Sequence, residues 1–183
     1  MTLDHLWAGW RREYVVSASS AQSGGEASTS GDPNGDPPDD PAHCVFCRIA
    51  ASGPPSAQNG VLWVGPLTFA VLNAYPYASG HLMAMPLRHV ASLGDLTEDE
   101  ATELWSTTRR AVATLEAALG PEGINLGANL GRAAGAGLPR HLHLHAVPRW
   151  VGDTNFMTAV ADTRVLPETL AATWERLHYA WPG

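Results

Sequence analysis

The chain has 183 residues and a mass of 19.4 kDa, a size typical of one domain with tails. Its formal net charge of −7 and pI near 5.5 argue against nucleic acid or an anionic membrane as a non-specific partner, because both require a basic surface. The sequence contains no apolar run long enough to cross a bilayer and begins without a signal-peptide pattern, so we expect a cytoplasmic protein.

The first 42 residues divide into two parts of different composition. Residues 1–16 hold two tryptophans and a tyrosine, and such side chains bury large areas when they dock on a folded body. Residues 17–42 are mainly Ser, Gly, Asp, Pro and Ala, which cannot bury enough apolar surface to offset the entropy of ordering. We therefore expect an aromatic N-terminal arm at 1–16, a disordered linker at 17–42 and a folded domain at 43–183.

Short apolar segments after the linker predict a β-sheet. Residues 61–64 and 68–72 flank a Gly-Pro pair, which indicates a hairpin. Residues 80–86 and 123–130 predict two further strands, and a histidine-rich segment near residue 143 predicts the fifth.

Two helices accompany these strands. Thr97 and Glu100 have the spacing of a capping box, apolar residues then recur at helical spacing, and Gly120 ends the pattern. Pro167 is expected to open a terminal helix with an apolar stripe formed by Leu170, Trp174 and Leu177. The elements together predict an α+β fold: a mostly antiparallel five-stranded sheet, one long helix and a C-terminal helix.

The segment His141-Leu142-His143-Leu144-His145 is the most informative part of the chain. In an extended strand, alternate residues point to one face, so the three imidazoles would project together while the two leucines enter the core. Adjacent imidazoles need partners, which a metal, an electrophile or a phosphate would supply. A surface strand that is merely histidine-rich, or an expression tag, fits less well with the internal position and the strict alternation.

Cys44 and Cys47 form a C-x-x-C motif. Two thiolates at this spacing can share one tetrahedral zinc ion, provided that two further ligands come from elsewhere. A redox pair is the competing interpretation, although the following segment lacks the βαβ pattern that usually accompanies one. Two small buried apolar side chains would also fit the motif.

A glycine-rich loop, residues 131–137, precedes the histidines. Backbone amides in such a loop can approach phosphate oxygens closely, which makes Gly135 and Gly137 candidate nucleotide-binding residues. Many loops of this composition are only turns, so this signal is weak without its neighbours.

The alternating histidines, followed by Pro148-Arg149-Trp150, resemble the signature of the histidine triad (HIT) superfamily of nucleotide hydrolases and transferases. The resemblance implies a HIT-like fold and a nucleophile at His143, which attacks the α-phosphorus of a nucleotide derivative. A covalent nucleotidyl-histidine forms, and water or phosphate then resolves it. His145 is expected to face the phosphate oxygens as a second catalytic residue.

The resemblance also implies a structural zinc site and further nucleotide contacts. In zinc-bearing relatives an N-terminal C-x-x-C joins a mid-chain histidine and the first triad histidine, and the matching residues here are Cys44, Cys47, His89 and His141. Residues that match nucleotide-binding positions are Asn73, Asn129 and Trp150. Turn formation is an alternative role for the two asparagines, and a core position for the tryptophan.

Within the family, the arm and most of residues 44–178 most resemble actinobacterial-type diadenosine tetraphosphate phosphorylases. The resemblance implies an adenine nucleotide substrate, inorganic phosphate as the acceptor and, as is common in the family, a homodimer or higher homo-oligomer. A hydrolase of dinucleoside polyphosphates or nucleoside phosphoramidates is the alternative, and a nucleotide-binding regulatory protein is an alternative of another class. Many HIT hydrolases carry Gln followed by Ser or Thr before the triad, where this chain has Gly137 and Leu138. The leaving-group contact is therefore expected to come from another group.

Overall fold

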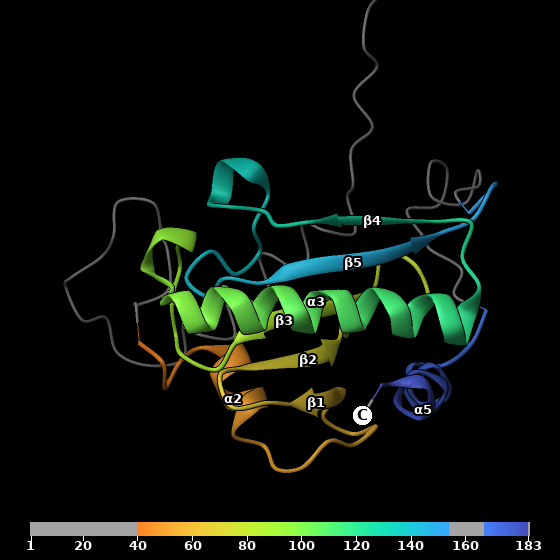
Figure 1. The fold of residues 1–183 in the computed structure, drawn as a ribbon, viewed down its shortest axis with the longest axis horizontal. Coiled ribbons are helices and arrows are strands. Elements are labelled where there is room, and N and C mark those ends of the chain that lie inside the picture. Colours follow the sequence, from red (N-terminus) through yellow and green to blue (C-terminus); the bar gives the residue numbers. More distant parts are fainter. Residues whose placement is uncertain (1–39, 154–166, 183) are drawn as a thin grey trace, which may run out of the picture. The chain divides into compact units, whose positions relative to one another are not determined.

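The computed structural model describes residues 40–153 and 167–182 (Figure 1). The predicted arm and all but the last three residues of the predicted linker lie outside the described residues, so both stay predictions. Within the described part, no helix is both long enough and apolar enough to span a membrane. The helices and strands are α2 (Val45–Ala50), β1 (Val61–Val64), β2 (Thr68–Leu72), β3 (Leu82–Pro86), α3 (Glu98–Leu119), β4 (Gly123–Gly127), β5 (Leu144–Arg149) and α5 (Leu170–Ala180).

The five strands form one sheet in the order β1-β2-β3-β5-β4, and every neighbouring pair is antiparallel. This arrangement confirms the predicted α+β fold class. Strands β1 and β2 have the predicted bounds, and β2 and β3 are buried along their whole length because both sheet faces are covered.

Three strand bounds differ from the prediction. β3 starts at Leu82 rather than at residue 80, because Gly80 has a φ of +85° and belongs to the preceding turn. A Cβ atom at Gly80 would lie 2.4 Å from Leu119 Cδ1, so a larger residue there would also displace the end of the Leu119 side chain on α3. β4 ends at Gly127 rather than at residue 130, and β5 starts only at Leu144.

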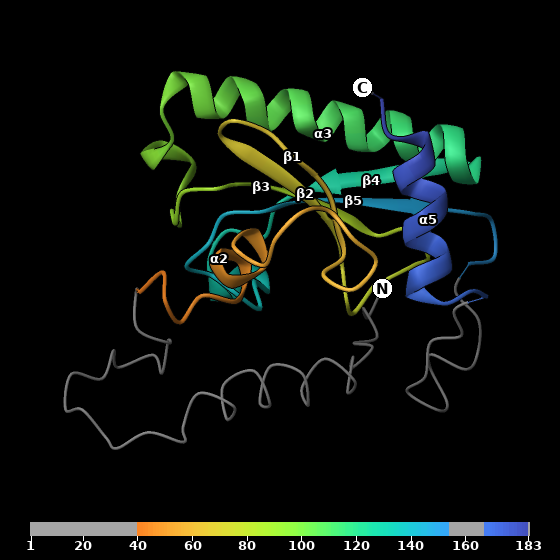
Figure 2. The same ribbon diagram turned by 90° about the horizontal axis from the view of Figure 1, so that it is seen from below.

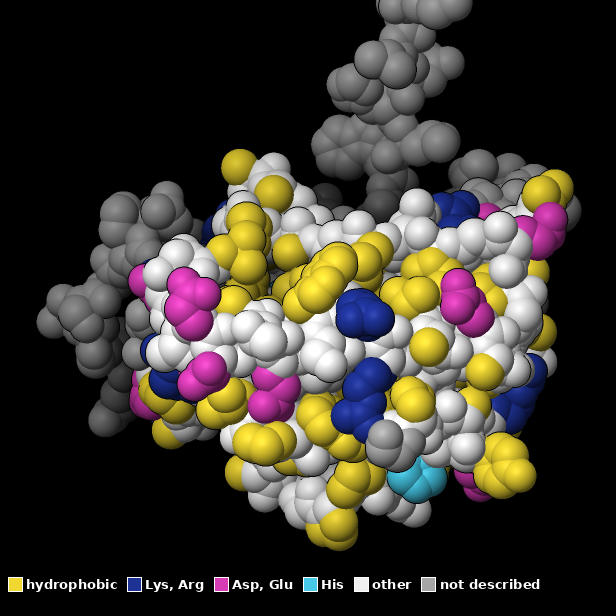
Figure 3. Space-filling model, in the orientation of Figure 1, with side chains coloured by type: hydrophobic (Ala, Val, Ile, Leu, Met, Phe, Trp, Pro, Cys, Tyr) yellow, Lys and Arg dark blue, Asp and Glu magenta, His cyan; other side chains and the backbone are white. Residues whose placement is uncertain are grey.

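Helix α3 lies across one face of the sheet (Figures 1 and 2). Its capping box is present: Thr97 accepts from the amide of Glu100, and Glu100 accepts from the amide of Thr97. Gly120 takes the left-handed conformation that ends the helix. The solvent side of this face carries dispersed arginine, acidic and apolar side chains (Figure 3), as expected of an amphipathic helix. The core beneath it comprises Leu62, Leu72, Leu82, Ala111, Leu115, Ala146 and Leu177.

The opposite face of the sheet is covered by the short helix α2 (Figure 2). The sequence does not predict this helix, because six residues are too few to show helical periodicity and Cys44 at its N-cap makes no side-chain cap. Packing therefore stabilises it, through an apolar cluster of Phe46, Val61, Phe69, Val71, Met83 and Met85.

Helix α5 packs beside α3 at the β1 end of the sheet. It starts at Leu170, because Thr169 accepts a hydrogen bond from the amide of Ala172 and acts as the N-cap in place of the expected start at Pro167. Leu177 is fully buried, but Leu170 is 37% exposed, so the predicted stripe does not include its first member.

Candidate active site and metal cluster

The three triad histidines lie on the sheet face that α2 covers. His145 is opposite Met83 in the β3–β5 register, and Met83 belongs to the apolar cluster under α2. Leu142 and Leu144 point to the other face, where they pack with Ala84 of β3 and Leu104 of α3. The side chains of this segment therefore alternate between the two sheet faces as predicted, although His141 and His143 precede β5.

The segment before β5 is held by a different neighbour. The amide of Leu142 donates to the carbonyl oxygen of Val90 at 2.6 Å, so this residue pairs with the β3–α3 connection rather than with β3. That connection also carries His89. The pairing brings the first two triad histidines toward the segment that holds the predicted mid-chain ligand.

His143 is 7% exposed and has a defined hydrogen-bond partner. Its Nδ1 lies 2.8 Å from the carbonyl oxygen of His141. A carbonyl only accepts, so Nδ1 carries the hydrogen and the lone pair of the neutral ring is on Nε2. Burial lowers the pKa of His143 below its ordinary value of 6.5, against the opposing effect of that hydrogen bond. The ring is therefore neutral at pH 7, the state in which Nε2 can attack an electrophile.

In His145 the hydrogen bond at Nδ1 runs in the opposite direction to that in His143. Its Nδ1 lies 2.9 Å from Nε2 of His81, and Nδ1 of His81 accepts from the backbone amide of Tyr77 at 3.2 Å. Because the Tyr77 amide only donates, Nε2 of a neutral His81 carries the hydrogen and donates to His145. The hydrogen of neutral His145 is then on Nε2.

The middle and third rings are neighbours that offer different atoms. Their centroids are 4.8 Å apart, and the rings meet edge to face at 79°. One presents a lone pair on Nε2 and the other an N–H group, a combination suited to attack on a phosphorus whose oxygens accept a hydrogen bond.

The C-x-x-C motif comes together with the two predicted histidine ligands. Cys44 Sγ lies 3.4 Å from Nδ1 of His141, Cys47 Sγ lies 3.4 Å from Nδ1 of His89, and Cys47 Sγ lies 3.6 Å from Nδ1 of His141. All four ligand atoms lie within 4.8 Å of one another. Bonds of 2.0–2.3 Å at tetrahedral angles would place neighbouring zinc ligands roughly 3.3–3.8 Å apart, so these sulfur–nitrogen separations fit such an ion.

The surroundings of the cluster support metal binding. Nε2 of His141 lies 2.9 Å from the carbonyl oxygen of Pro86, so it carries the hydrogen and Nδ1 presents its lone pair to the sulfurs. Burial lowers the pKa of His141 to about 4, which keeps the ring neutral. Burial, followed by the neighbouring Cys44, raises the pKa of Cys47 to about 12, so a bound metal would displace a proton from this thiol.

The predicted nucleotide-binding residues lie in several segments, and Trp150 follows the end of β5 opposite to His145. Asn73 is half-buried; its Nδ2 lies 3.2 Å from His81 Nδ1, and its Oδ1 accepts from the amide of Tyr75. Asn129 and Trp150 are half-buried, after β4 and β5 respectively. The amide of Gly135 donates to the carbonyl of Arg132 within the loop, and Gly137 is half-buried. Nucleotide binding by these residues stays a prediction.

Sequence reasoning missed the contribution of His81. The predicted strand at residues 80–86 contains this histidine without a distinctive pattern, whereas the structure buries its ring fully and bonds it directly to His145. The sequence does contain a signal, because His81 lies two residues before Met83, the residue that pairs with His145. This signal can be recognised only once the β3–β5 register is known.

Comparisons with known proteins identify the family of the chain. The profile of the HIT domain family matches residues 56–151. The AP-4-A phosphorylase of Mycobacterium tuberculosis (strain H37Rv) is 39% identical over 180 residues, which cover 98% of this chain and 85% of that protein. A bis(5'-adenosyl)-triphosphatase of Dictyostelium discoideum is 33% identical over 92 residues, or 50% of this chain and 61% of that protein.

A solved structure supports the same family. The Zn-bound histidine triad family protein of Mycobacterium smegmatis superposes with a TM-score of 0.62 at 25% identity, covering 78% of this chain and 95% of that one. The chain belongs to the HIT family. The expectation of a nucleotide-processing enzyme is confirmed at the level of this class, whose members named above include a phosphorylase and a triphosphatase.

Proposed function

We propose that the chain is a diadenosine tetraphosphate phosphorylase, which transfers an adenylyl group to inorganic phosphate. The 39% identity to the mycobacterial AP-4-A phosphorylase over 98% of the chain supports this substrate. The observation that carries the chemistry is the buried His143, whose Nδ1 is held by the carbonyl of His141 so that Nε2 is the nucleophilic atom.

The reaction has two displacements at one phosphorus atom. Nε2 of His143 attacks the α-phosphorus and forms an N–P bond, while the bond from this phosphorus to the oxygen that bridges to the β-phosphorus breaks and ATP leaves. An oxygen of inorganic phosphate then attacks the same phosphorus. The N–P bond breaks, ADP is released and the imidazole is regenerated.

His145 stabilises the charge on the phosphorus during both steps. Its Nε2–H, set by the hydrogen bond from His81, donates to a non-bridging phosphate oxygen. The leaving-group contact of many HIT hydrolases has no counterpart at Leu138, because this side chain packs against the apolar cluster under α2. Another group near the triad therefore meets the leaving oxygen.

The cluster of Cys44, Cys47, His89 and His141 is proposed to hold one structural zinc ion. Two thiolates and two imidazoles are a ligand set that tetrahedral zinc accepts, and the Zn-bound family member from Mycobacterium smegmatis supports the choice of metal. The ion would tie α2 to the segment before β5. Metal analysis of the purified protein is expected to give about one zinc per chain.

The acceptor is tested by incubation with diadenosine tetraphosphate in the presence and absence of inorganic phosphate. ADP formed only with phosphate supports the phosphorylase. AMP formed at the same rate without phosphate would support the alternative, a dinucleoside polyphosphate hydrolase. The similarity to a triphosphatase is the reason for testing this alternative. A protein that binds the nucleotide but never becomes adenylylated in a single turnover would instead be a regulatory binder.

A further inference from the structure

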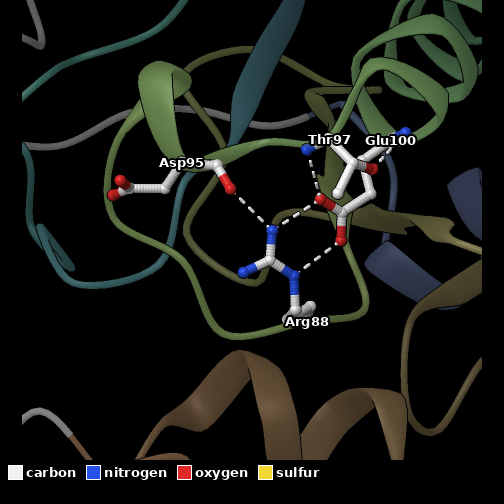
Figure 4. A network of polar contacts seen from close by, with 4 residues as sticks. All are labelled: Arg88, Asp95, Thr97 and Glu100. Carbon is white, nitrogen blue, oxygen red and sulfur yellow. Dashed lines mark hydrogen bonds and ion pairs between the residues drawn. The ribbon is translucent and has the colours of Figure 1, made fainter.

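The loop between β3 and α3 carries the proposed metal ligand His89, and the residue before it is anchored to α3. Arg88 Nε donates to Glu100 Oε1 at 2.8 Å, and its second terminal nitrogen donates to Glu100 Oε2 at 2.6 Å (Figure 4). The same nitrogen donates to the carbonyl oxygen of Asp95 at 2.6 Å. A two-pronged arginine–carboxylate pair fixes direction as well as distance.

Glu100 is itself held in place. It is 5% exposed, and its Oε2 also accepts from the amide of Thr97 at 2.8 Å, as part of the α3 capping box. The hydrogen bonds from Arg88 and Thr97 lower the pKa of Glu100 to about 2, so it is ionised at neutral pH. The carboxylate is thus a fixed anchor at the start of a 22-residue helix.

The residue after His89 is anchored on the other side. Val90 is 6% exposed in the core beneath α3, and its carbonyl oxygen accepts from the amide of Leu142, next to His141. His89 therefore lies between one neighbour tied to α3 and another tied to the triad segment. Its Nδ1 points to Cys47 Sγ at 3.4 Å.

We propose that the Arg88–Glu100 pair is a positioning device for the metal site, which orients His89 toward the C-x-x-C sulfurs and thereby tightens zinc binding. This inference rests on the zinc site of the proposed function. The hydrogen bonds of Arg88 described above lead away to Glu100 and Asp95, so it acts on the cluster through the adjoining backbone of His89. Partners of this outer kind typically change metal affinity 10–100-fold when they are lost.

Helix α3 offers a matched control at Glu103. Its Oε1 accepts from the amides of Leu67 and Thr68 and from the Thr68 hydroxyl, so it ties the same helix to the β1–β2 turn. Glu100→Gln and Glu103→Gln each remove one anchoring charge from α3. Only the first removes the partner of the residue beside His89.

The test is the zinc dissociation constant of the full-length protein, measured by competition with a chromogenic chelator. Glu100→Gln and Arg88→Lys are expected to weaken zinc binding by about 10-fold or more, with Glu103→Gln within about twofold of the wild type. Arg88→Lys keeps the charge and serves if Glu100→Gln does not fold. The melting temperatures of the metal-free proteins separate a general loss of stability from a specific loss of affinity.

Two results would overturn the inference in different ways. Wild-type affinity in both Glu100→Gln and Arg88→Lys, or an equal loss in Glu103→Gln, would remove the positioning role and leave the zinc site intact. A wild-type protein that does not bind zinc would remove the metal part of the proposed function together with this inference.

Discussion

The first and third histidines of one five-residue segment have different surroundings. His141 is 1% exposed, and its ring faces two cysteine sulfurs with a backbone carbonyl behind it. His145 is half-buried and accepts a hydrogen bond from another histidine, His81. His143 lies between them in the sequence. Its Nδ1 donates to the carbonyl oxygen of His141, and its ring meets the ring of His145 edge to face.

The difference shows how one repeating pattern can support the three different chemical functions proposed above. Alternation places the three rings on one face and makes them equivalent. The neighbours that distinguish them are the carbonyl oxygen of Pro86 at the end of β3, the carbonyl oxygen of His141, and the ring of His81 just before β3. Each of these neighbours fixes which ring nitrogen carries the hydrogen, so the tautomers match the proposed metal ligand, nucleophile and phosphate donor.

The largest effect is expected from His143→Ala. Removing this ring deletes the atom that forms the N–P bond but leaves its two neighbours, so turnover and covalent adenylylation should both be abolished while nucleotide binding stays measurable. Trapping with labelled diadenosine tetraphosphate would check the loss of adenylylation, and equilibrium binding would check that the nucleotide still binds. Near-native turnover of this variant would refute the proposed mechanism.

Metal removal tests the role proposed for His141 separately from the role proposed for His145. Stripping zinc with a chelator is expected to lower the free energy of unfolding by about 4 kcal/mol, the linkage expected where free zinc stands near 1,000 times its dissociation constant. His141→Ala should be destabilised similarly and should no longer respond to the chelator. Denaturant unfolding with and without chelator measures both, and a wild-type protein with the same stability in both conditions would contradict the prediction.

His145→Ala tests the other end of the segment. It should slow turnover by about 10²–10³-fold, by analogy with the loss of one oxyanion-hole donor. Zinc content should not change, because His145 contributes no atom to the cysteine–histidine cluster. Steady-state kinetics and metal analysis of one preparation check this, and a loss of zinc in this variant would show that the two ends are not independent.

The smallest effect is expected from His81→Phe, which keeps an aromatic ring and removes the hydrogen bond to His145. One such bond contributes about 1 kcal/mol, so kcat should fall by about five- to tenfold with KM nearly unchanged. The melting temperature controls for the amide of the half-buried Tyr77, which also loses its acceptor. An unchanged kcat would mean that His145 is oriented without His81.

The sequence predicts the scaffold well where periodicity is strong. The hairpin, the capping box at Thr97 and the end of α3 at Gly120 follow from local residue preferences. It fails where tertiary contacts decide. Helix α2 needs Phe46 in a cluster that also takes residues from the three strands β1, β2 and β3, and the start of β5 depends on Leu142 pairing with Val90.

The candidate site divides in the same way. Family resemblance is enough to select the four candidate ligands and the candidate nucleophile. It does not identify the partners that fix the ring tautomers, because the carbonyls of Pro86 and His141 carry no side-chain signal. The part played by His81 depends on a strand register that sequence alone leaves undetermined.

Glu100 links the initiation of a helix to the closure of a loop. Its carboxylate caps the first turn of α3 and holds Arg88, so fraying of that turn releases the loop as well. The two segments should therefore open as one cooperative unit. Amide hydrogen exchange in the first turn of α3 and in the loop that carries His89 should then share one protection level, distinct from that of the helix centre.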